Sequence, residues 1–277
     1  MPTLHPLKTA NICHPQMTQD TNEVKVSTPA FSASMDSLLQ SLDESCIRSY
    51  YQPIVDLRSY EVLGFENLSR GPLGTPYESP LALFAAAEQA GCLLQVERLC
   101  RNAGIRRARL TLGQKLFINV SPHILLDPSF RVGETRKVLE SAGLTPSQVV
   151  FEVTERQAIE DYAQFTRLLC HYREQGYQIA IDDFGAGYSG LLTLIQIKPD
   201  FVKIDKQMID NLDEHPLKRR VVQATCEIAS AFSGIVIAEG IETDKELMAA
   251  KACGVEVGQG FWFGRPCLAQ GAKEDAN

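Results

Sequence analysis

Residues 179–190 read IAIDDFGAGYSG, an apolar run that ends in the adjacent acids Asp182 and Asp183 and continues into a glycine-rich segment. Three kinds of site share these features. Asp-Phe-Gly occurs in the magnesium-binding loop of protein kinases, GxGxxG occurs at dinucleotide-binding turns, and paired acids ligate metal ions. The rest of the sequence is needed to distinguish these three interpretations.

The two nucleotide-loop interpretations fit the surrounding sequence poorly. A protein kinase needs an upstream His-Arg-Asp sequence, and the chain contains none. The glycine pattern does find an acid, Asp205, about twenty residues further on, as a dinucleotide site requires. However, the two acids directly before the glycines would repel a pyrophosphate. Both interpretations therefore remain as minor alternatives.

Composition narrows the class of protein. The chain has 277 residues, of which 44% are hydrophobic and 22% charged, as in an ordinary globular protein. Its net charge of −7 and the lack of a basic run argue against binding to a DNA or RNA duplex. No segment has the length for direct membrane insertion or resembles a signal peptide, so we expect a cytoplasmic protein. The eight widely spaced cysteines are expected to be reduced thiols.

The chain divides into three parts. Residues 1–36 are polar and lack periodicity, so we expect a flexible leader or linker. Residues 37–270 contain no further linker-like break and are expected to form one α/β domain. Residues 271–277 are expected to form a disordered tail.

Short β-rich runs recur through the expected domain, and helical patterns separate most of them. One such helix should stop at Gly176 and another should begin at Pro216. Because strand number and length both fit, the pattern predicts a (β/α)8 TIM-like barrel. The expected strands cover residues 49–55, 62–68, 115–120, 149–154, 178–182, 201–205, 234–239 and 255–260.

Polar residues stand within these strands or at their carboxyl ends, which converge on one rim of a parallel barrel. They are Glu66, Asn119, Glu152, Asp182, Asp183, Lys203, Glu239 and Gln259. Five carboxylates at one rim would repel one another unless cations join them. All-oxygen ligands favour Mg²⁺ or Mn²⁺, and adjacent acids suit a pair of ions. The plainer alternatives are a helix cap at the paired acids and a barrel salt bridge for Lys203.

With these residues in place, the sequence resembles the EAL family of bacterial phosphodiesterases, which open cyclic di-GMP. The resemblance covers about residues 45–268. It is carried by YQPIVDL (51–57), GFENLSR (64–70), INVSP (118–122), FEVTE (151–155), IDDFGAGYSGL (181–191), VKID (202–205), AEGIE (238–242) and GQGFWFGRP (258–266).

The resemblance implies a role for each matching position. It makes Glu66, Asn119, Glu152, Asp182, Asp183 and Glu239 ligands of two divalent cations, Mg²⁺ or Mn²⁺, with Ca²⁺ inhibitory. Lys203 would hold the attacking water, with Glu239 and Glu242 as further catalytic residues. Substrate contacts would come from Gln52, Arg70, Asp205 and Gln259. Glu155 would support the loop at 184–190, and a homodimer and an antiparallel first strand are further expectations.

Two departures from the family pattern stand out. Asn67 replaces the usual alanine after Glu66, and Gly190 stands where serine is common. Since neighbouring residues of a strand point to opposite faces, the Asn67 side chain should point away from that of Glu66, so we expect activity to survive. The expected activity is hydrolysis of cyclic di-GMP to linear pGpG. A catalytically silent cyclic di-GMP receptor and a pure protein-interaction scaffold remain as alternatives.

Overall fold

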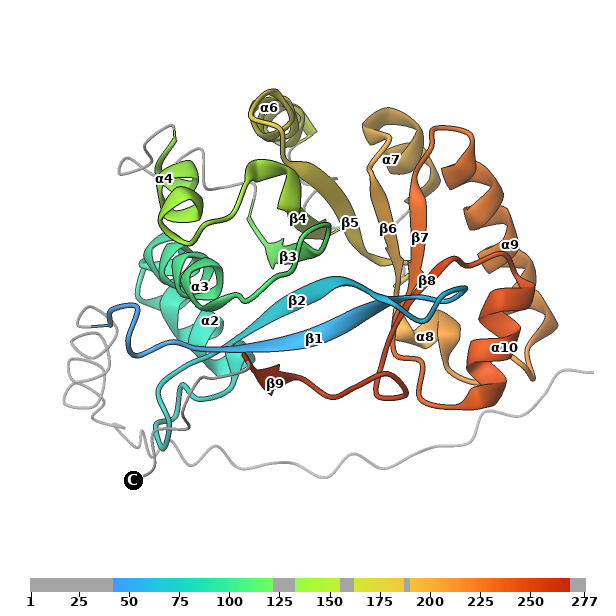
Figure 1. The fold of residues 1–277 in the computed structure, drawn as a ribbon, viewed down its shortest axis with the longest axis horizontal. Helices are drawn as coiled ribbons and strands as arrows, with labels where there is room; N and C mark the ends of the chain where they lie inside the picture. Colours follow the sequence, from blue (N-terminus) through green and yellow to red (C-terminus); the bar gives the residue numbers. More distant parts are fainter. Residues whose placement is uncertain (1–41, 122–132, 155–161, 187–189, 270–277) are drawn as a thin grey trace, which may run out of the picture.

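The computed structural model describes residues 42–121, 133–154, 162–186 and 190–269. Strands β2 to β8 follow one another around a sheet, and β1 pairs with both β8 and β2, which closes the barrel (Figure 1). β1 runs antiparallel to both neighbours, whereas the pairs from β2 to β8 are parallel. The predicted (β/α)8 barrel with an antiparallel first strand is therefore confirmed.

The elements have the following bounds. The strands are β1 (Arg48–Asp56), β2 (Val62–Arg70), β3 (Lys115–Asn119), β4 (Val149–Thr154), β5 (Gln178–Phe184), β6 (Phe201–Ile204), β7 (Ile235–Ala238), β8 (Val257–Gln259) and β9 (Cys267–Leu268). The helices are α2 (Pro80–Gln89), α3 (Leu93–Arg107), α4 (Glu134–Ser141), the short 3₁₀ helix η2 (Pro146–Gln148), α6 (Tyr162–Glu174), α7 (Gly190–Ile197), α8 (Lys206–Ile209), α9 (Pro216–Ser230) and α10 (Asp244–Ala252).

Local sequence signals set several helix ends. α9 begins at Pro216, and Gly176, with φ of 88°, follows the end of α6, as the sequence predicts. The Ser79 side chain caps α2 by accepting from the Ala82 amide at 3.2 Å. Thr243 and Glu246 form a reciprocal capping box at α10, which satisfies amide groups at its first turn.

An apolar layer fills the barrel directly below the polar strand ends. It includes the rings of Phe117 and Phe201, which meet edge to face with centroids 5.1 Å apart. Alternate residues of a strand face the same side, so the residue two positions after each member of the layer faces the interior again. In every strand from β3 to β8 that residue is polar. The layer consists of Ile54, Phe117, Val150, Ala180, Phe201, Ile237 and Val257.

The structure also settles several details of the sequence interpretation. The glycine-rich segment leads from β5 towards α7 within a closed barrel, so the dinucleotide interpretation, which needs an open doubly wound sheet, is wrong. The sequence did not predict β9, which pairs with β1. The expected leader at 1–36, the tail at 271–277 and Glu155 lie outside the described residues. None of the helices in the described ranges has the length and apolar character that crossing a membrane requires.

Asn67 packs on the outer face of β2 against α3, on the opposite face of the strand from Glu66. Only 5% of the Asn67 surface is exposed, and its Nδ2 lies 3.4 Å from Ser69 Oγ. The side chain fits because α3 carries glycine at position 104. A Cβ atom on Gly104 would lie 2.5 Å, 2.6 Å and 2.7 Å from the Nδ2, Cγ and Oδ1 atoms of Asn67. The departure at position 67 is therefore matched by a glycine in the neighbouring helix.

This contact predicts a compensating pair of substitutions. Gly104→Ala should lower the free energy of unfolding by about 1–3 kcal/mol, because the new methyl group overlaps the Asn67 side chain. In an Asn67→Ala background the same change should cost almost nothing, since the obstruction is gone and alanine favours the helix. Urea unfolding of the four proteins measures the coupling. An equal cost in both backgrounds would contradict the proposed contact.

Candidate metal centre

The Lys203 ammonium group lies at the centre of four carboxylates in the barrel mouth. Its Nζ is 2.7 Å from Glu152 Oε1, 2.8 Å from Glu239 Oε1, 3.1 Å from Asp182 Oδ1 and 3.4 Å from Glu66 Oε2. The four acids come from β4, from the end of β7, from β5 and from β2. Only 1% of the Lys203 surface is exposed. The barrel therefore holds a buried cluster with one positive and four acidic groups.

Burial and mutual repulsion shift the pKa values in this cluster. Burial alone would lower the pKa of Lys203, but the surrounding carboxylates outweigh it and raise that pKa well above its usual value. Burial also raises the pKa values of Glu152 and Glu239 well above the usual range, although Lys203 opposes the shift. No second Lys or Arg among the described residues forms an ion pair with these four acids. The cluster is short of positive charge.

Three side-chain amides complete the ring. Asn119 Nδ2 lies 3.2 Å from Glu152 Oε2 and 3.5 Å from Glu66 Oε1. Gln259 Nε2 donates to Glu66 Oε2 at 2.6 Å and to Gln52 Oε1 at 3.1 Å. Gln259 Oε1 is buried and has no hydrogen-bond partner. The antiparallel direction of β1 brings Gln52 here, because it places Gln52 opposite Glu66.

The carboxylates form two groups that suit metal ions. Oxygen atoms of Glu66, Glu152 and Asp182 lie within 4.8 Å of one another, and so do those of Asp182, Asp183 and Glu239. Asp182 belongs to both groups. Asp183 adopts a left-handed conformation with φ of 56°, which aspartate tolerates better than most residues. Burial, with the charges of Asp182 and Asp205, raises the pKa of Asp183 to about 6. An all-oxygen, acid-rich donor set fits hard divalent cations.

Three predicted residues lie at the rim rather than in the cluster. Glu242 is exposed and forms an ion pair with Lys206. Asp205 caps α8 by accepting from the Gln207 amide at 2.7 Å. Arg70 donates to the Ser69 carbonyl oxygen at 2.9 Å, and its guanidinium carbon lies 5.9 Å from the centroid of the Tyr50 ring. None of these contacts contradicts the catalytic or substrate-binding roles expected for these three residues, and none tests those roles.

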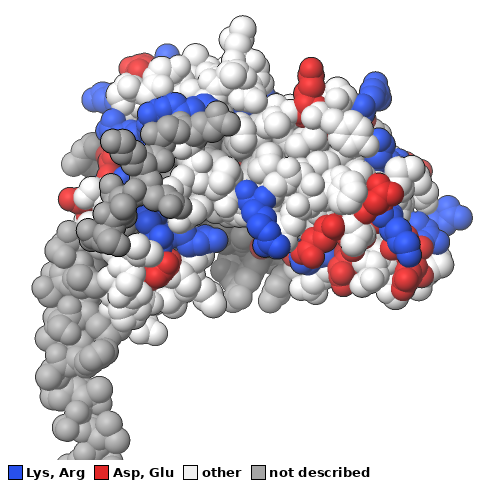
Figure 2. Space-filling model, turned by 60° about the horizontal axis from the view of Figure 1, so that its bottom comes forward, with Lys and Arg blue, Asp and Glu red and all other residues white. Residues whose placement is uncertain are grey.

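A pocket of about 230 Å³ opens over the cluster. Its lining includes Glu66 and Glu239 from the cluster and Glu242 from the rim, so Glu242 does face the same space as Glu239. Figure 2 shows blue and red side chains interspersed on the face turned forward, with no single basic field. The other lining residues are Gln52, Lys206, Gly240, Gln259, Gly260 and Phe261.

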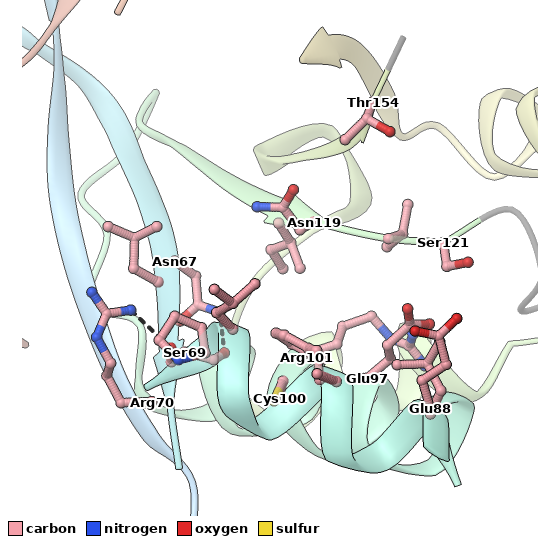
Figure 3. A pocket seen from close by; sticks show the side chains of 18 residues that line it. Asn67, Ser69, Arg70, Glu88, Glu97, Cys100, Arg101, Asn119, Ser121 and Thr154 are labelled. Carbon is pink, nitrogen blue, oxygen red and sulfur yellow. Dashed lines mark hydrogen bonds between the residues drawn. The ribbon is translucent and has the colours of Figure 1, made fainter. Parts of the chain in front are cut away.

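The sequence interpretation missed some polar residues around the site. Lys206, directly after Asp205, lines this pocket, and its position at the start of a helix after β6 was a usable signal. Glu97 and Arg101 on α3 line a second pocket, together with Asn119 and Arg70 (Figure 3). A Glu-Arg pair four residues apart is an ordinary surface pattern, so no local signal indicates that Arg101 is buried.

Comparison with known proteins places this arrangement in a family. The model of the EAL domain matches residues 35–266. The Escherichia coli (strain K12) protein named "Probable cyclic di-GMP phosphodiesterase PdeN" is 32% identical over 222 residues, which cover 78% of this chain and 42% of PdeN. The E. coli "Blue light- and temperature-regulated antirepressor BluF" is 28% identical over 79% of this chain and 54% of its own length. The chain thus spans about half or less of the length of these relatives.

The solved structures agree with the sequence relatives. Klebsiella pneumoniae BlrP1 in complex with manganese and cyclic di-GMP superposes with a TM-score of 0.74 at 35% identity, covering 81% of this chain and 57% of BlrP1. A calcium complex of BlrP1 with cyclic di-GMP gives a TM-score of 0.75 at 34% identity, covering 81% of this chain and 56% of BlrP1. The matched span includes every strand from β1 to β8 and the whole carboxylate cluster. This chain belongs to the EAL domain family.

Proposed function

We propose that this chain is a metal-dependent phosphodiesterase that hydrolyses cyclic di-GMP to linear pGpG. The observation that carries the proposal is the ring of four carboxylates around the buried Lys203, with Asp183 beside it. The family relatives named as cyclic di-GMP phosphodiesterases support the same substrate. The assay that tests it is conversion of cyclic di-GMP to pGpG with Mg²⁺ or Mn²⁺, and absence of turnover at any loading would exclude it.

The residues fit two divalent cations. Glu66, Asn119, Glu152 and Asp182 would hold one, and Asp182, Asp183 and Glu239 would hold the other. Bound there, Mg²⁺ or Mn²⁺ would lower the pKa of water and neutralise charge on the phosphate oxygens. The unsatisfied charge of the cluster and the unpartnered Gln259 Oε1 support the presence of such ions.

The protein side chains would then position and activate the reactants. Lys203 would orient the attacking water through its ammonium group, and Glu239 would accept the water proton. Arg70 would hold the phosphate in line with the departing 3′ oxygen. Gln52, Asp205, Glu242 and Gln259 would contact the substrate or order the centre, and Glu155 would support the loop after β5.

A homodimer is the assembly that we propose for the active form. α7, which follows the acids of β5 closely, exposes three large apolar side chains, Leu191, Leu192 and Ile195. A contact between two copies at this helix would lie near Asp182 and Asp183 in the chain. Sedimentation of the purified protein, compared with a Leu192→Asp variant, tests this assembly.

The second candidate function is a receptor that binds cyclic di-GMP without cleaving it. The similarity to BluF, which is named an antirepressor, favours this alternative. The complete set of acids at the predicted metal positions favours the enzyme. Binding of cyclic di-GMP without turnover would select the receptor, and absence of any nucleotide binding would select a protein-interaction scaffold.

Removal of a single carboxylate should abolish turnover and leave the fold intact. We expect Glu152→Gln and Asp182→Asn each to lower kcat by about 100-fold or more, because each removes an anionic ligand from the cluster. Glu140→Gln, an exposed change on α4, serves as the matched control and should keep the wild-type rate. Wild-type turnover in either site variant would disprove the metal assignment.

Lys203→Ala should separate a structural role from a catalytic one. Without metal the variant should unfold at a much lower temperature than the wild type, because the four acids lose the one cation that pairs with them among the described residues. Mn²⁺ should restore most of that stability, yet kcat should stay about 100-fold below the wild type if Lys203 orients water. Lys245→Ala on α10 is the control. Turnover that recovers together with stability would show that Lys203 is only structural.

Calcium should support binding of cyclic di-GMP but not its hydrolysis. Ca²⁺ accepts longer bonds than Mg²⁺ and lowers the pKa of bound water less, so a nucleophile forms less readily. Calorimetry in Ca²⁺ should show binding, while turnover should fall at least about 10-fold relative to Mn²⁺. Equal rates in the two metals would count against a metal-activated nucleophile.

A further inference from the structure

The carboxylate of Glu246 joins two loops at the mouth of the barrel. Its Oε2 accepts hydrogen bonds from the backbone amides of Glu242 and Thr243, each at 3.0 Å, and its Oε1 accepts from the Asn211 amide at 3.1 Å. Glu242 and Thr243 belong to the loop after β7, whereas Asn211 follows α8, the short helix after β6. Only 5% of the Glu246 surface is exposed. A buried side chain of α10 therefore ties together the segments that follow two neighbouring strands.

Helix capping accounts for only one of these three bonds. In the capping box of α10 the Glu246 side chain accepts from the Thr243 amide, and Thr243 Oγ1 accepts from the Glu246 amide at 3.2 Å. The bonds from Glu242 and Asn211 lie outside the cap, and the second crosses 35 residues of chain. Burial alone would raise the pKa of Glu246, but the amide hydrogen bonds outweigh it and lower that pKa. The group is thus a charged acceptor that serves the loops as well as the helix.

The two joined loops carry side chains that face the metal centre. Glu242 lines the pocket over the carboxylate cluster, together with Glu239 and Lys206. Lys206 forms an ion pair with Glu242 and crosses Gly240, where a Cβ atom would lie 2.5 Å from Lys206 Cγ. The two paired side chains are 54% and 42% exposed, so solvent weakens their attraction. Hydrogen bonds from buried amides to a charged acceptor are stronger, so the placement of Glu242 depends mainly on Glu246.

We propose that Glu246 is a positioning residue for the reaction, because its hydrogen bonds to the loops hold the Glu242 carboxylate over the metal centre. This inference rests on the proposed function, in which Glu242 contacts the substrate or orders the centre. Glu246 does not line the pocket, so it would act through Glu242 and not on the substrate. A carboxylate on a loosened loop would occupy several positions, and small errors in position are costly to the rate.

Glu246→Gln tests this role with almost no change in shape. All three partners are N–H donors, so the amide group that replaces one carboxylate oxygen turns a donor towards a donor. Either the bond from Asn211 or the bonds from the loop after β7 must be lost, and the two loops are then no longer joined. We expect kcat for cyclic di-GMP with Mn²⁺ to fall about 10- to 100-fold. KM should change less than about 3-fold, since the proposed contacts of Arg70 and Gln259 remain.

Thr243→Val is the matched control at the same helix end. It removes the side-chain acceptor of the helix cap and leaves the Glu246 carboxylate in place. This variant should therefore have a lower Tm than the wild type and keep the wild-type kcat and KM. If Glu246 only stabilised α10, Glu246→Gln would behave in the same way, with a lower Tm and an unchanged rate per folded molecule.

A second comparison asks whether Glu246 acts through Glu242. Glu242→Ala should itself lower kcat, and adding Glu246→Gln to it should lower kcat no further, because residues that act as a unit are not additive. The same fold loss from Glu246→Gln in both backgrounds would overturn the proposed action through Glu242.

Amide hydrogen exchange, resolved by residue, tests the joining of the loops without any turnover. Glu246→Gln should speed exchange at the amide of Asn211 or Glu242, whereas Thr243→Val should speed it at the Glu246 amide only. Wild-type kcat in Glu246→Gln would overturn the positioning role and leave the phosphodiesterase intact. If the wild type shows no turnover, the proposed function fails. Unchanged exchange at both Asn211 and Glu242 would then still overturn the inference, because Glu246 would not be holding the loops.

Discussion

Among the described residues, Lys203 is the one lysine or arginine whose charged group pairs with the four carboxylates of the barrel mouth, three of which are buried. Such a cluster can exist only where the surrounding structure fixes every member. Water stabilises the charge of a carboxylate better than a lysine that is shared among several acids. The apolar layer beneath it provides that fixation. All of its members except Ile54 lie two residues before the polar positions at the ends of β3 to β8, so packing of this layer also sets how far along the barrel axis each polar side chain lies.

The antiparallel first strand determines what surrounds the cluster. Because β1 and β2 form a hairpin, no helix connects them, and α2 and α3 both follow β2 before the chain enters β3. In Figure 1 these two helices lie together beside the hairpin. The second pocket opens between them and the strand ends. The reversal that brings Gln52 to Glu66 thus belongs to the same topology that makes room for a ligand group next to the metal centre.

The sequence predicts the cluster better than its surroundings, for a physical reason. The position of a residue at a strand end and the alternation of side-chain direction along a strand are local properties. Glu152, Asp182 and Lys203 could therefore be placed on one rim from the sequence alone. The burial of Arg101 depends instead on how α3 packs on the barrel, which no local pattern encodes. The same holds for Asn67, whose fit depends on Gly104 in a different element. Glu242 belongs to the predicted set, but its pairing with Lys206 follows from the loop conformation.

The position of Asn119 suggests how the two pockets would act together. Its amide contacts the carboxylate cluster, and its side chain also forms part of the wall of the pocket that contains Arg101. In the proposed function, binding energy gained at the base would hold the phosphodiester against the metal centre, where small errors in position are costly to the rate.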